Sequence, residues 1–501
     1  MHRNRDFDLK DPAPWNERAL TQDLALKTLF AAAAGEDELI EKAVRVSLLG
    51  GWRNDPETIL YRQAVALDGL NNPEVLRELY QLTVEAIASK RDLYYFGYRS
   101  SSPSLVLHGA IALLQMYLGA LRHLREIAEV HAHRFASEGV SALFEMLQRE
   151  LSEEYLSQVA AQLEGLQFRR GVLISGALGP GNAGCDYVLR QGSTDRRGWL
   201  QRLLAGRPAG YTYRVPDRDE VGGRELSDLR DRGIQLVARN LGRAADQIDG
   251  FFQSLRAELA FYVGCLNLRE QLAALGEPTC FPRPLPIGQR SMRCRELYDP
   301  CLALQMKQRL VGNTVDAAGM SAVIVTGANR GGKSSFLRGL GLAQLMLQCG
   351  MFVGAEDFES ELCAGLITHY KREEDPSLKS GKLDEELARM SECVDHLAPN
   401  VMVFFNESFS STNEREGSEI ARQVVLGLVE EGIKVHFVTH LHAFARGLFE
   451  SKAPWALFLR AERMPDGTRT FRLIEGEPLA TSYGRDLYER IFAAGPMSRS
   501  V

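Results

Sequence analysis

One glycine-rich octapeptide, Gly327–Ser334, constrains the fold of this chain more than any other segment. It fits the phosphate-loop pattern GxxxxGK[ST]. The apolar run Ala322–Val325 before it predicts a buried strand, and the apolar-faced run Ser335–Gln348 after it predicts a helix. Strand, glycine loop and helix form the setting in which backbone N–H groups and a helix N-terminus hold phosphate. We therefore predict an α/β P-loop domain around this segment.

The residue types in this loop predict a site for a nucleoside triphosphate and Mg²⁺. Lys333 supplies a point charge to the β- and γ-phosphates and is a candidate catalytic residue, and the Ser334 hydroxyl is a candidate Mg²⁺ ligand. The alternative is a glycine-rich turn with a chance Lys-Ser pair. The predicted nucleotide contacts are Gly327, Ala328, Asn329, Arg330, Gly331, Gly332, Lys333, Ser334 and Ser335.

Two further apolar runs end in polar residues that suit hydrolysis. Val401–Phe405 is followed by Asn406 and Glu407, where many phosphate-loop ATPases place Asp and then Glu. Asn406 brings an amide oxygen that can bind Mg²⁺ through water but carries no charge, and Glu407 is the candidate general base. Val435–Thr439 leads in the same way to His440. A lone histidine is usually a surface or core residue, but at this strand end we predict contact with the γ-phosphate or the attacking water.

Bulk properties are those of an ordinary soluble globular protein of two to four domains. The chain has 501 residues, 25% of them charged, and a formal net charge of −6. This charge neither requires nor excludes nucleic acid, because a local basic surface can bind phosphates on an acidic protein. The 8 cysteines show no paired CxxC spacing, so we expect reduced thiols in the cytoplasm and no zinc. With no signal-peptide pattern, and with the apolar run Gly109–Leu121 too short to span a bilayer, we expect no membrane association.

The first half of the chain predicts a helical region that serves as a scaffold or lever. Apolar residues recur at helical spacing over residues 20–165 and again over residues 226–275. The proline-rich stretch Cys280–Pro286 predicts an extended link. We place the domain boundary there, with the helical region at residues 1–285 and the P-loop domain at residues 286–501.

The segment 165–245 differs in composition from the helices around it. Strand-like runs at Phe168–Ile174 and Tyr187–Leu189 flank a glycine cluster, which predicts a hairpin more than a second phosphate loop because no Lys-Ser/Thr pair follows. Arginines are frequent after residue 190, mixed with acidic residues. They predict either a DNA contact surface or a solvated face, and both interpretations stay open. The candidate DNA contacts are Arg196, Arg197, Arg202 and Arg207.

Four motifs, in order along the C-terminal part, resemble those of the DNA mismatch-repair MutS family. TGANRGGKSS at 326–335 resembles the family's TGPNMGGKST, with Ala and Arg in place of Pro and Met. GMFVGA at 350–355 is similar to its G-x-F-V-P-A. FVTH at 437–440 resembles its F-A-T-H, and TSYG at 481–484 resembles the S-Y-G near the end of its ATPase domain.

The resemblance implies an ABC/MutS-like ATPase domain with a mainly parallel sheet, C-terminal to a mostly helical core with a clamp-like insertion at residues 165–245. It implies ATP and Mg²⁺ as cofactors, DNA as a partner, and a homodimer in which each nucleotide is closed by the partner subunit. The residues that it places at this subunit interface are Ser380, Ser411, Thr412 and Asn413.

Two departures from the family pattern shape the functional hypotheses. No mismatch-reading domain and no Phe-x-Glu wedge stand in the first third of the chain, and Asn406 replaces an acidic residue. The first hypothesis is a DNA-stimulated ATPase that grips mismatched, branched or distorted DNA through shape and backbone charge in repair or recombination control. The second is a nucleotide-switched interaction protein that does not bind DNA. The third is an ATPase that acts on ribosomes or structured RNA.

Overall fold

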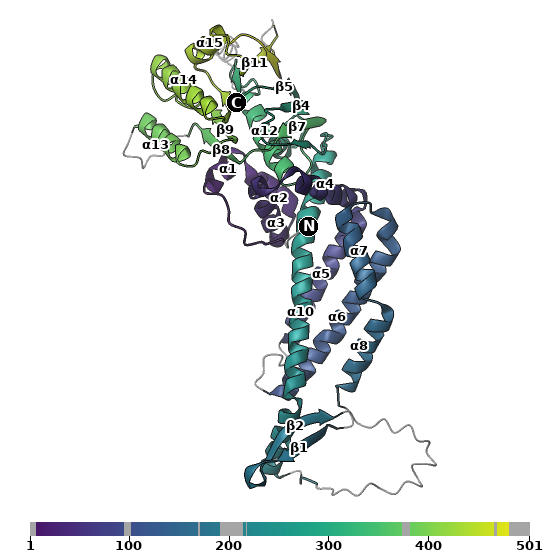
Figure 1. The fold of residues 1–501 in the computed structure, drawn as a ribbon. Helices are drawn as coiled ribbons and strands as arrows, with labels where there is room; N and C mark the ends of the chain where they lie inside the picture. Colours follow the sequence, from purple (N-terminus) through teal and green to yellow (C-terminus); the bar gives the residue numbers. More distant parts are fainter. Residues whose placement is uncertain are drawn as a thin grey trace, which may run out of the picture. The chain divides into compact units, whose positions relative to one another are not determined.

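The computed structural model describes residues 7–94, 102–168, 171–190, 214–216, 218–372, 381–464 and 468–479. The chain forms two compact units. The sheet unit consists of Met1–Leu76, Phe135–Val140 and Ala257–Val501, and the helical unit consists of Arg77–Arg134 and Ser141–Arg256. Figure 1 shows the ribbon of both units.

The helical unit is built from long helices, as the apolar spacing predicts. Their bounds are α5 (Pro73–Tyr94), α6 (Pro103–His131), α7 (Glu138–Glu150), α8 (Glu153–Gly165) and α10 (Glu220–Ala274), with a 3-10 turn η2 at Ala132–Arg134. A buried polar group fixes three of these helices to one another: the Asp249 carboxylate on α10 accepts from Tyr117 Oη at 2.9 Å and from Lys90 Nζ at 2.7 Å. The helical prediction for residues 20–165 is confirmed for the described residues.

Two short strands follow α8 and form the hairpin that the glycine cluster predicts. β1 (Leu173–Leu178) pairs antiparallel with β2 (Gly184–Arg190), and the 3-10 turn η3 (Pro180–Asn182) joins them. β1 begins later than the predicted run Phe168–Ile174 because Phe168 has a left-handed φ of 48°, which is incompatible with a strand. Gly176 lies inside β1, so the cluster forms one strand end and a turn, and the expected hairpin is confirmed.

One helix in the described part of the chain is long and apolar enough to cross a membrane by those criteria alone. It runs over Pro103–Arg134, with a mean hydropathy of 1.6 in its most apolar window, and half of that window is buried in the structure. A core helix of a soluble protein meets the same criteria, so the absence of membrane association stays a prediction.

A six-stranded sheet dominates the sheet unit. Its order is β12-β11-β6-β10-β9-β8, and every neighbouring pair is parallel except β11 and β12. The bounds are β6 (Ala322–Thr326), β8 (Gly365–Tyr370), β9 (Val401–Asn406), β10 (Lys434–Val438), β11 (Ala456–Arg463) and β12 (Arg469–Glu475). The three strands expected around the P-loop are therefore β6, β9 and β10, and the prediction of a mainly parallel sheet is confirmed.

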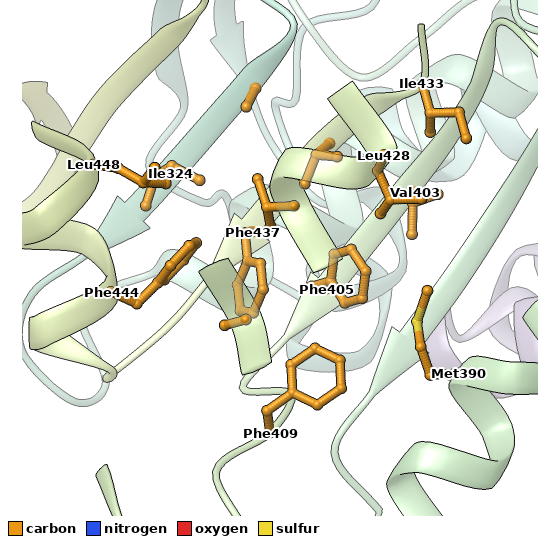
Figure 2. Close-up of a cluster of buried hydrophobic side chains, with 14 of the residues drawn as sticks. Ile324, Met390, Val403, Phe405, Phe409, Leu428, Ile433, Phe437, Phe444 and Leu448 are labelled. Carbon is orange, nitrogen blue, oxygen red and sulfur yellow. The ribbon is translucent and has the colours of Figure 1, made fainter. Parts of the chain in front are cut away.

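Helices cover both faces of this sheet. On one face, the rings of Phe405 and Phe437 stack with their centroids 4.8 Å apart, and Phe444 packs against Phe437 at 5.2 Å (Figure 2). This core cluster includes side chains from α14 (Glu414–Glu430), α15 (His442–Glu450) and α13 (Lys382–Val394). Because successive strand residues point to opposite faces, α12 (Lys333–Gln348), which contacts β9 and β10, covers the other face.

A second, four-stranded sheet corrects one expectation. Its order is β3-β7-β4-β5, with bounds β3 (Arg283–Leu285), β4 (Met292–Leu297), β5 (Asn313–Asp316) and β7 (Asp357–Glu361). The stretch Cys280–Pro286, predicted as a link, instead contains β3, which pairs in parallel with β7. Pro284 is tolerated because β3 is an edge strand. The compact units accordingly do not divide at residues 285 and 286, since Ala257–Val501 belongs to one unit.

N-terminal helices belong to the same unit and reach the far end of the P-loop helix. They are α1 (Glu17–Asp23), α2 (Leu26–Ala34), α3 (Glu38–Leu49), the 3-10 turn η1 (Gly51–Arg53) and α4 (Pro56–Asn71), and α11 (Pro300–Met306) contacts α2. At the C-terminus of α12, Asn54 Nδ2 donates to the Gln348 carbonyl at 2.9 Å. A Cβ at Gly51 would lie 2.9 Å from the Cys349 nitrogen, so η1 is seated directly against this helix end.

We predict that Phe437→Ala lowers the free energy of unfolding of the sheet unit by about 3–5 kcal/mol, because the ring is fully buried and its loss leaves a cavity. Urea denaturation followed by tryptophan fluorescence measures the change. Leu67→Ala, at a side chain that is 45% exposed, is the control and should shift stability by less than about 0.5 kcal/mol. Equal effects of both substitutions would contradict the assignment of Phe437 to the core.

Candidate functional site

Parallel pairing brings the predicted polar residues to one edge of the six-stranded sheet. Val438 at the end of β10 lies opposite Val325 in β6 on one side and Asn406 in β9 on the other. The chain then continues in register, since Thr439 N donates to the Val325 carbonyl at 3.0 Å and Glu407 N donates to the Val438 carbonyl at 2.8 Å. The carboxyl ends of three strands thus meet at the start of α12, which is where ligands bind in open α/β sheets.

The glycine loop has a shape that side chains would prevent. Gly327 has a φ of 111° and Gly332 a φ of 87°, both in the left-handed region that glycine adopts without strain. A Cβ at Gly327 would lie 2.8 Å from the Ala461 nitrogen of β11, and one at Gly332 would lie 3.0 Å from the Phe471 carbonyl oxygen of β12. The loop is therefore packed against both strands, while Asn329 and Arg330 at its tip are exposed.

Lys333 lies inside this loop, 4% exposed. Its ammonium group donates to the carbonyl oxygens of Gly327 at 3.0 Å and Ala328 at 2.9 Å. Burial lowers the pKa of Lys333 to about 8, opposed by the negative charge of Glu407 and assisted by the positive charge of Arg469. Both of these hydrogen-bond partners are neutral carbonyls. A bound phosphate would supply the negative charge that a buried ammonium group requires.

Ser334 and Asn406 form the second contact across the edge. The Ser334 hydroxyl donates to the Asn406 amide oxygen at 3.0 Å. Ser334 is exposed at the start of α12 and Asn406 is half-buried at the end of β9. Two neutral oxygens at this spacing, with the Glu407 carboxylate next in the chain, are the hard oxygen ligands that Mg²⁺ prefers, so this donor set fits the predicted metal.

Glu407 and His440 form the third contact. His440 Nε2 donates to Glu407 Oε1 at 2.9 Å, and the two side chains are 27% and 34% exposed in that order. The hydrogen bond from His440 is the largest cause that lowers the pKa of Glu407; burial opposes it, and the charges of Lys333 and Lys371 add to it. Glu407 is therefore an ionised carboxylate, oriented by an imidazole N–H, at the mouth of the glycine loop.

Several predicted residues have only local roles in the structure. Asn413 caps α14 by accepting from Glu416 N at 3.0 Å, and the Thr412 hydroxyl donates to the Glu416 carboxylate at 2.6 Å. Ser411 lies half-buried in the same loop. Their placement at a subunit interface stays a prediction. Ser380, Arg196, Arg197, Arg202, Arg207 and the motif at 481–484 lie outside the described residues.

Arginines in the described part of the arginine-rich segment are mostly exposed, but Arg230 is half-buried. On α10, Arg224, Arg232 and Arg239 are exposed, and Arg224 lies 3.6 Å from Glu220 one turn earlier. Acidic residues alternate with the arginines on this helix, so both the DNA surface and the solvated face remain compatible with it.

Three residues near the site were not predicted from the sequence. His369 and Glu386 contact Ser408 and Phe409, in the turn that follows Glu407. Phe471, which is 48% exposed, has its main-chain carbonyl beside Gly332 of the glycine loop. No motif marks any of them, since their chain positions are remote or lie in strands that the sequence did not predict.

Two family models of MutS-type proteins match the chain, one in each half. A family model for the MutS2 N-terminal domain matches residues 54–275, and one for MutS domain V matches residues 323–491. The chain belongs to the MutS family. The domain V match covers β6 through β12, and members of that domain family are ATPases with a P-loop α/β fold.

The relatives are distant and longer. The chain is 28% identical over 225 residues to the DNA mismatch repair protein MutS of Chloroflexus aurantiacus, covering 43% of this chain and 23% of that protein. It is 27% identical over 228 residues to the endonuclease MutS2 of Thermus thermophilus, covering 43% and 28%. The MutS of Streptococcus pneumoniae is 24% identical over 265 residues, covering 52% and 31%. The chain thus spans less than a third of the length of each of these curated relatives.

We predict opposite stability changes for alanine at two glycines of the sheet unit. Gly332→Ala should destabilise by about 1–3 kcal/mol, because a left-handed φ and the nearby Phe471 carbonyl both oppose a Cβ. Gly447→Ala, in α15 with open space around it, should stabilise by about 0.5–1 kcal/mol. Thermal and urea denaturation of both variants test this, and a neutral Gly332→Ala would contradict the packing of the loop.

Proposed function

We propose that this MutS-family chain is an ATPase that binds ATP and Mg²⁺ at the glycine loop. Nucleotide binding and hydrolysis are coupled to its binding of mismatched, branched or distorted DNA, in repair or recombination control. The observation that carries the proposal is the convergence of three contacts at one sheet edge: Lys333 with the loop carbonyls, Ser334 with Asn406, and Glu407 with His440. We propose a cytoplasmic protein, in keeping with the composition.

In this mechanism the loop and its lysine bind the phosphates. Lys333 exchanges the carbonyls of Gly327 and Ala328 for β- and γ-phosphate oxygens, and its charged form is favoured by the anion. Backbone N–H groups at the start of α12 face the same phosphates, with the positive end of the helix behind them. Phe471 has its main-chain carbonyl beside Gly332 and is 48% exposed, and we propose that a purine base stacks on its ring.

Hydrolysis depends on the two side chains at the ends of β9 and β10. Glu407, ionised and fixed by His440, accepts the proton of the attacking water. Ser334 would hold Mg²⁺ directly and Asn406 through a water molecule. Bound Mg²⁺ neutralises charge on the β- and γ-phosphates. Because Asn406 contributes no charge, we propose weak metal binding and slow turnover.

The dimer and the DNA surface belong to the same proposal. MutS-family proteins bind DNA and usually form dimers. We propose that Ser411, Thr412 and Asn413, together with Ser380, lie against the nucleotide of a partner subunit. We propose that the arginine-rich segment of the helical unit contacts DNA phosphates.

Two alternatives keep specific support. The net charge of −6 and the neutral Asn406 are the features that support a nucleotide-switched interaction protein. An ATPase that acts on ribosomes or structured RNA would use the same site. Salt-titrated binding to DNA and RNA duplexes of equal length separates the three, because phosphate contacts make affinity fall steeply with salt.

We predict that Glu407→Gln lowers kcat for ATP by about 100-fold or more while ATP still binds, because it removes the proton acceptor and leaves the phosphate contacts. Lys333→Ala should abolish detectable ATP binding in calorimetry. Distorted or branched duplexes should raise the wild-type kcat several-fold. If no duplex, junction or single strand stimulates turnover, the DNA part of the proposal is wrong. If the wild-type protein binds no ATP, the ATPase proposal itself is wrong.

We predict that Asn406→Asp lowers the Mg²⁺ concentration needed for half-maximal ATPase rate by about 10-fold, because a carboxylate adds charge next to the metal position. The control is Asn400→Asp, the same exchange at the opposite end of β9, where Asn400 has a left-handed φ of 67° that Asp also tolerates. An unchanged Mg²⁺ dependence of Asn406→Asp would contradict the placement of the metal at this strand end.

A further inference from the structure

The turn that carries Glu407 is strained. Glu407 has a φ of 56° and Phe409 a φ of 61°, both left-handed although neither is glycine. Side chains with a Cβ disfavour this region, and such conformations persist only where the surroundings impose them. The direction of the Glu407 carboxylate therefore depends on the contacts that impose this backbone.

Ser408, between the two strained residues, is one source of those contacts. Its side chain is fully buried, and its Oγ lies 2.8 Å from Nδ1 of His369 and also donates to the main-chain carbonyl of the same residue. His369 is in β8, two strands away from β10, and is 1% exposed. The Ser408 hydroxyl thus connects the turn to β8, the edge strand of the sheet.

The protonation of His369 follows from its other partner. Nε2 of His369 lies 3.1 Å from the main-chain carbonyl of Glu386, which can only accept, so Nε2 carries the proton. Burial lowers the pKa of His369 to about 4, so the ring is neutral near pH 7 and Nδ1 carries a lone pair. The single proton of the Ser408 hydroxyl is therefore shared between two acceptors of His369, Nδ1 and the main-chain carbonyl. The ring bridges α13 and the turn in one tautomer.

Glu386 holds the second strained residue. Its carboxylate oxygen Oε1 accepts from Phe409 N at 3.2 Å, and the side chain is 3% exposed. On the other side, the Phe409 carbonyl approaches α14 so closely that a Cβ at Gly417 would lie 2.3 Å from it. The turn is thus held by contacts from β8, α13 and α14, all of them made by Ser408 and Phe409 and none by the Glu407 side chain.

We propose that His369, Ser408 and Glu386 are positioning residues that keep Glu407 in its left-handed conformation, with its carboxylate directed to the attacking water. This inference rests on the proposed ATPase function. The three residues touch neither phosphate nor metal position; they act through the backbone of Glu407 and Phe409. Their loss should therefore reduce turnover and leave nucleotide affinity intact.

The test compares Ser408→Ala, His369→Ala and His369→Asn in the full chain. ATP affinity is measured by calorimetry and kcat by phosphate release, with folding checked by thermal denaturation. Ser408→Ala and His369→Ala should each lower kcat by about 10- to 100-fold, because a small misplacement of a catalytic group costs that much, while the Kd for ATP changes by less than about 2-fold. His369→Asn should recover part of the loss, since an Asn oxygen can replace Nδ1 as the acceptor for Ser408.

Ser418→Ala is the matched control. Ser418 is 6% exposed on α14, and among the described residues its hydroxyl has no hydrogen-bond partner, so the substitution removes a buried oxygen without touching the turn. It should leave both kcat and Kd unchanged. A purely structural role of His369 and Ser408 would instead lower thermal stability and ATP affinity together, with no recovery in His369→Asn.

Failure of the inference and failure of the proposed function give different results. If Glu407→Gln loses turnover but Ser408→Ala and His369→Ala keep it, the positioning role is overturned and the ATPase proposal stands. If wild-type protein binds no ATP, or Glu407→Gln keeps full turnover, the proposed function fails first. Should His369→Ala not fold, an unchanged kcat in Ser408→Ala would alone overturn the inference.

Discussion

The parallel pairing of β6 with β10 and β11 is the constraint on which the site depends. β6 is buried along its whole length, and its register with β10 places Val325 opposite Val438. The same register places Asn406 beside Val438 from the other side. Because β6, β9 and β10 run in the same direction, the glycine loop, the Glu407 turn and His440 all follow the carboxyl ends of their strands and lie at one edge of the sheet. A shift of one residue in this register would move the side chains of β10 to opposite faces, breaking the aromatic stack of Phe405 on Phe437 and separating His440 from Glu407.

The strands of this core were predictable because their sequences carry several agreeing signals. Ala322–Val325 and Val401–Phe405 are short apolar runs bounded by polar or turn residues, and the structure extends each by a single residue as β6 and β9. β3 escaped prediction because prolines around it indicate an extended link, and only its place at the edge of a sheet permits Pro284. The division into units was also hidden. The proline-rich stretch Cys280–Pro286 suggests a boundary, but packing joins Met1–Leu76 to the sheet through contacts that are far apart in the chain.

Within the site, sequence motifs identify groups that act on a ligand and miss groups that act on the backbone. Lys333, Ser334, Glu407 and His440 stand at strand ends or in a known loop pattern, so their convergence followed from topology. His369 looks like one more strand residue, and Glu386 one of several acidic residues in an amphipathic helix. Their contacts with Ser408 and Phe409 span 39 and 23 positions of the sequence. Nothing local to either residue encodes a left-handed φ at Glu407, which became visible only in the folded backbone.

The seating of η1 on the end of α12 gives the P-loop helix a defined mechanical role. α12 has 16 residues, so its ends are about 24 Å apart at 1.5 Å per residue. The helix begins at Lys333 of the glycine loop. At its other end, the Asn54 amide donates to the Gln348 carbonyl and the backbone of Gly51 packs against Cys349. Nearly every residue between is buried, so surrounding side chains resist bending. The helix is therefore a rigid connection: under the proposed function, a displacement of its first turn on triphosphate binding would reach residues 51–54, nearly 300 positions earlier in the chain, as movement along the helix axis.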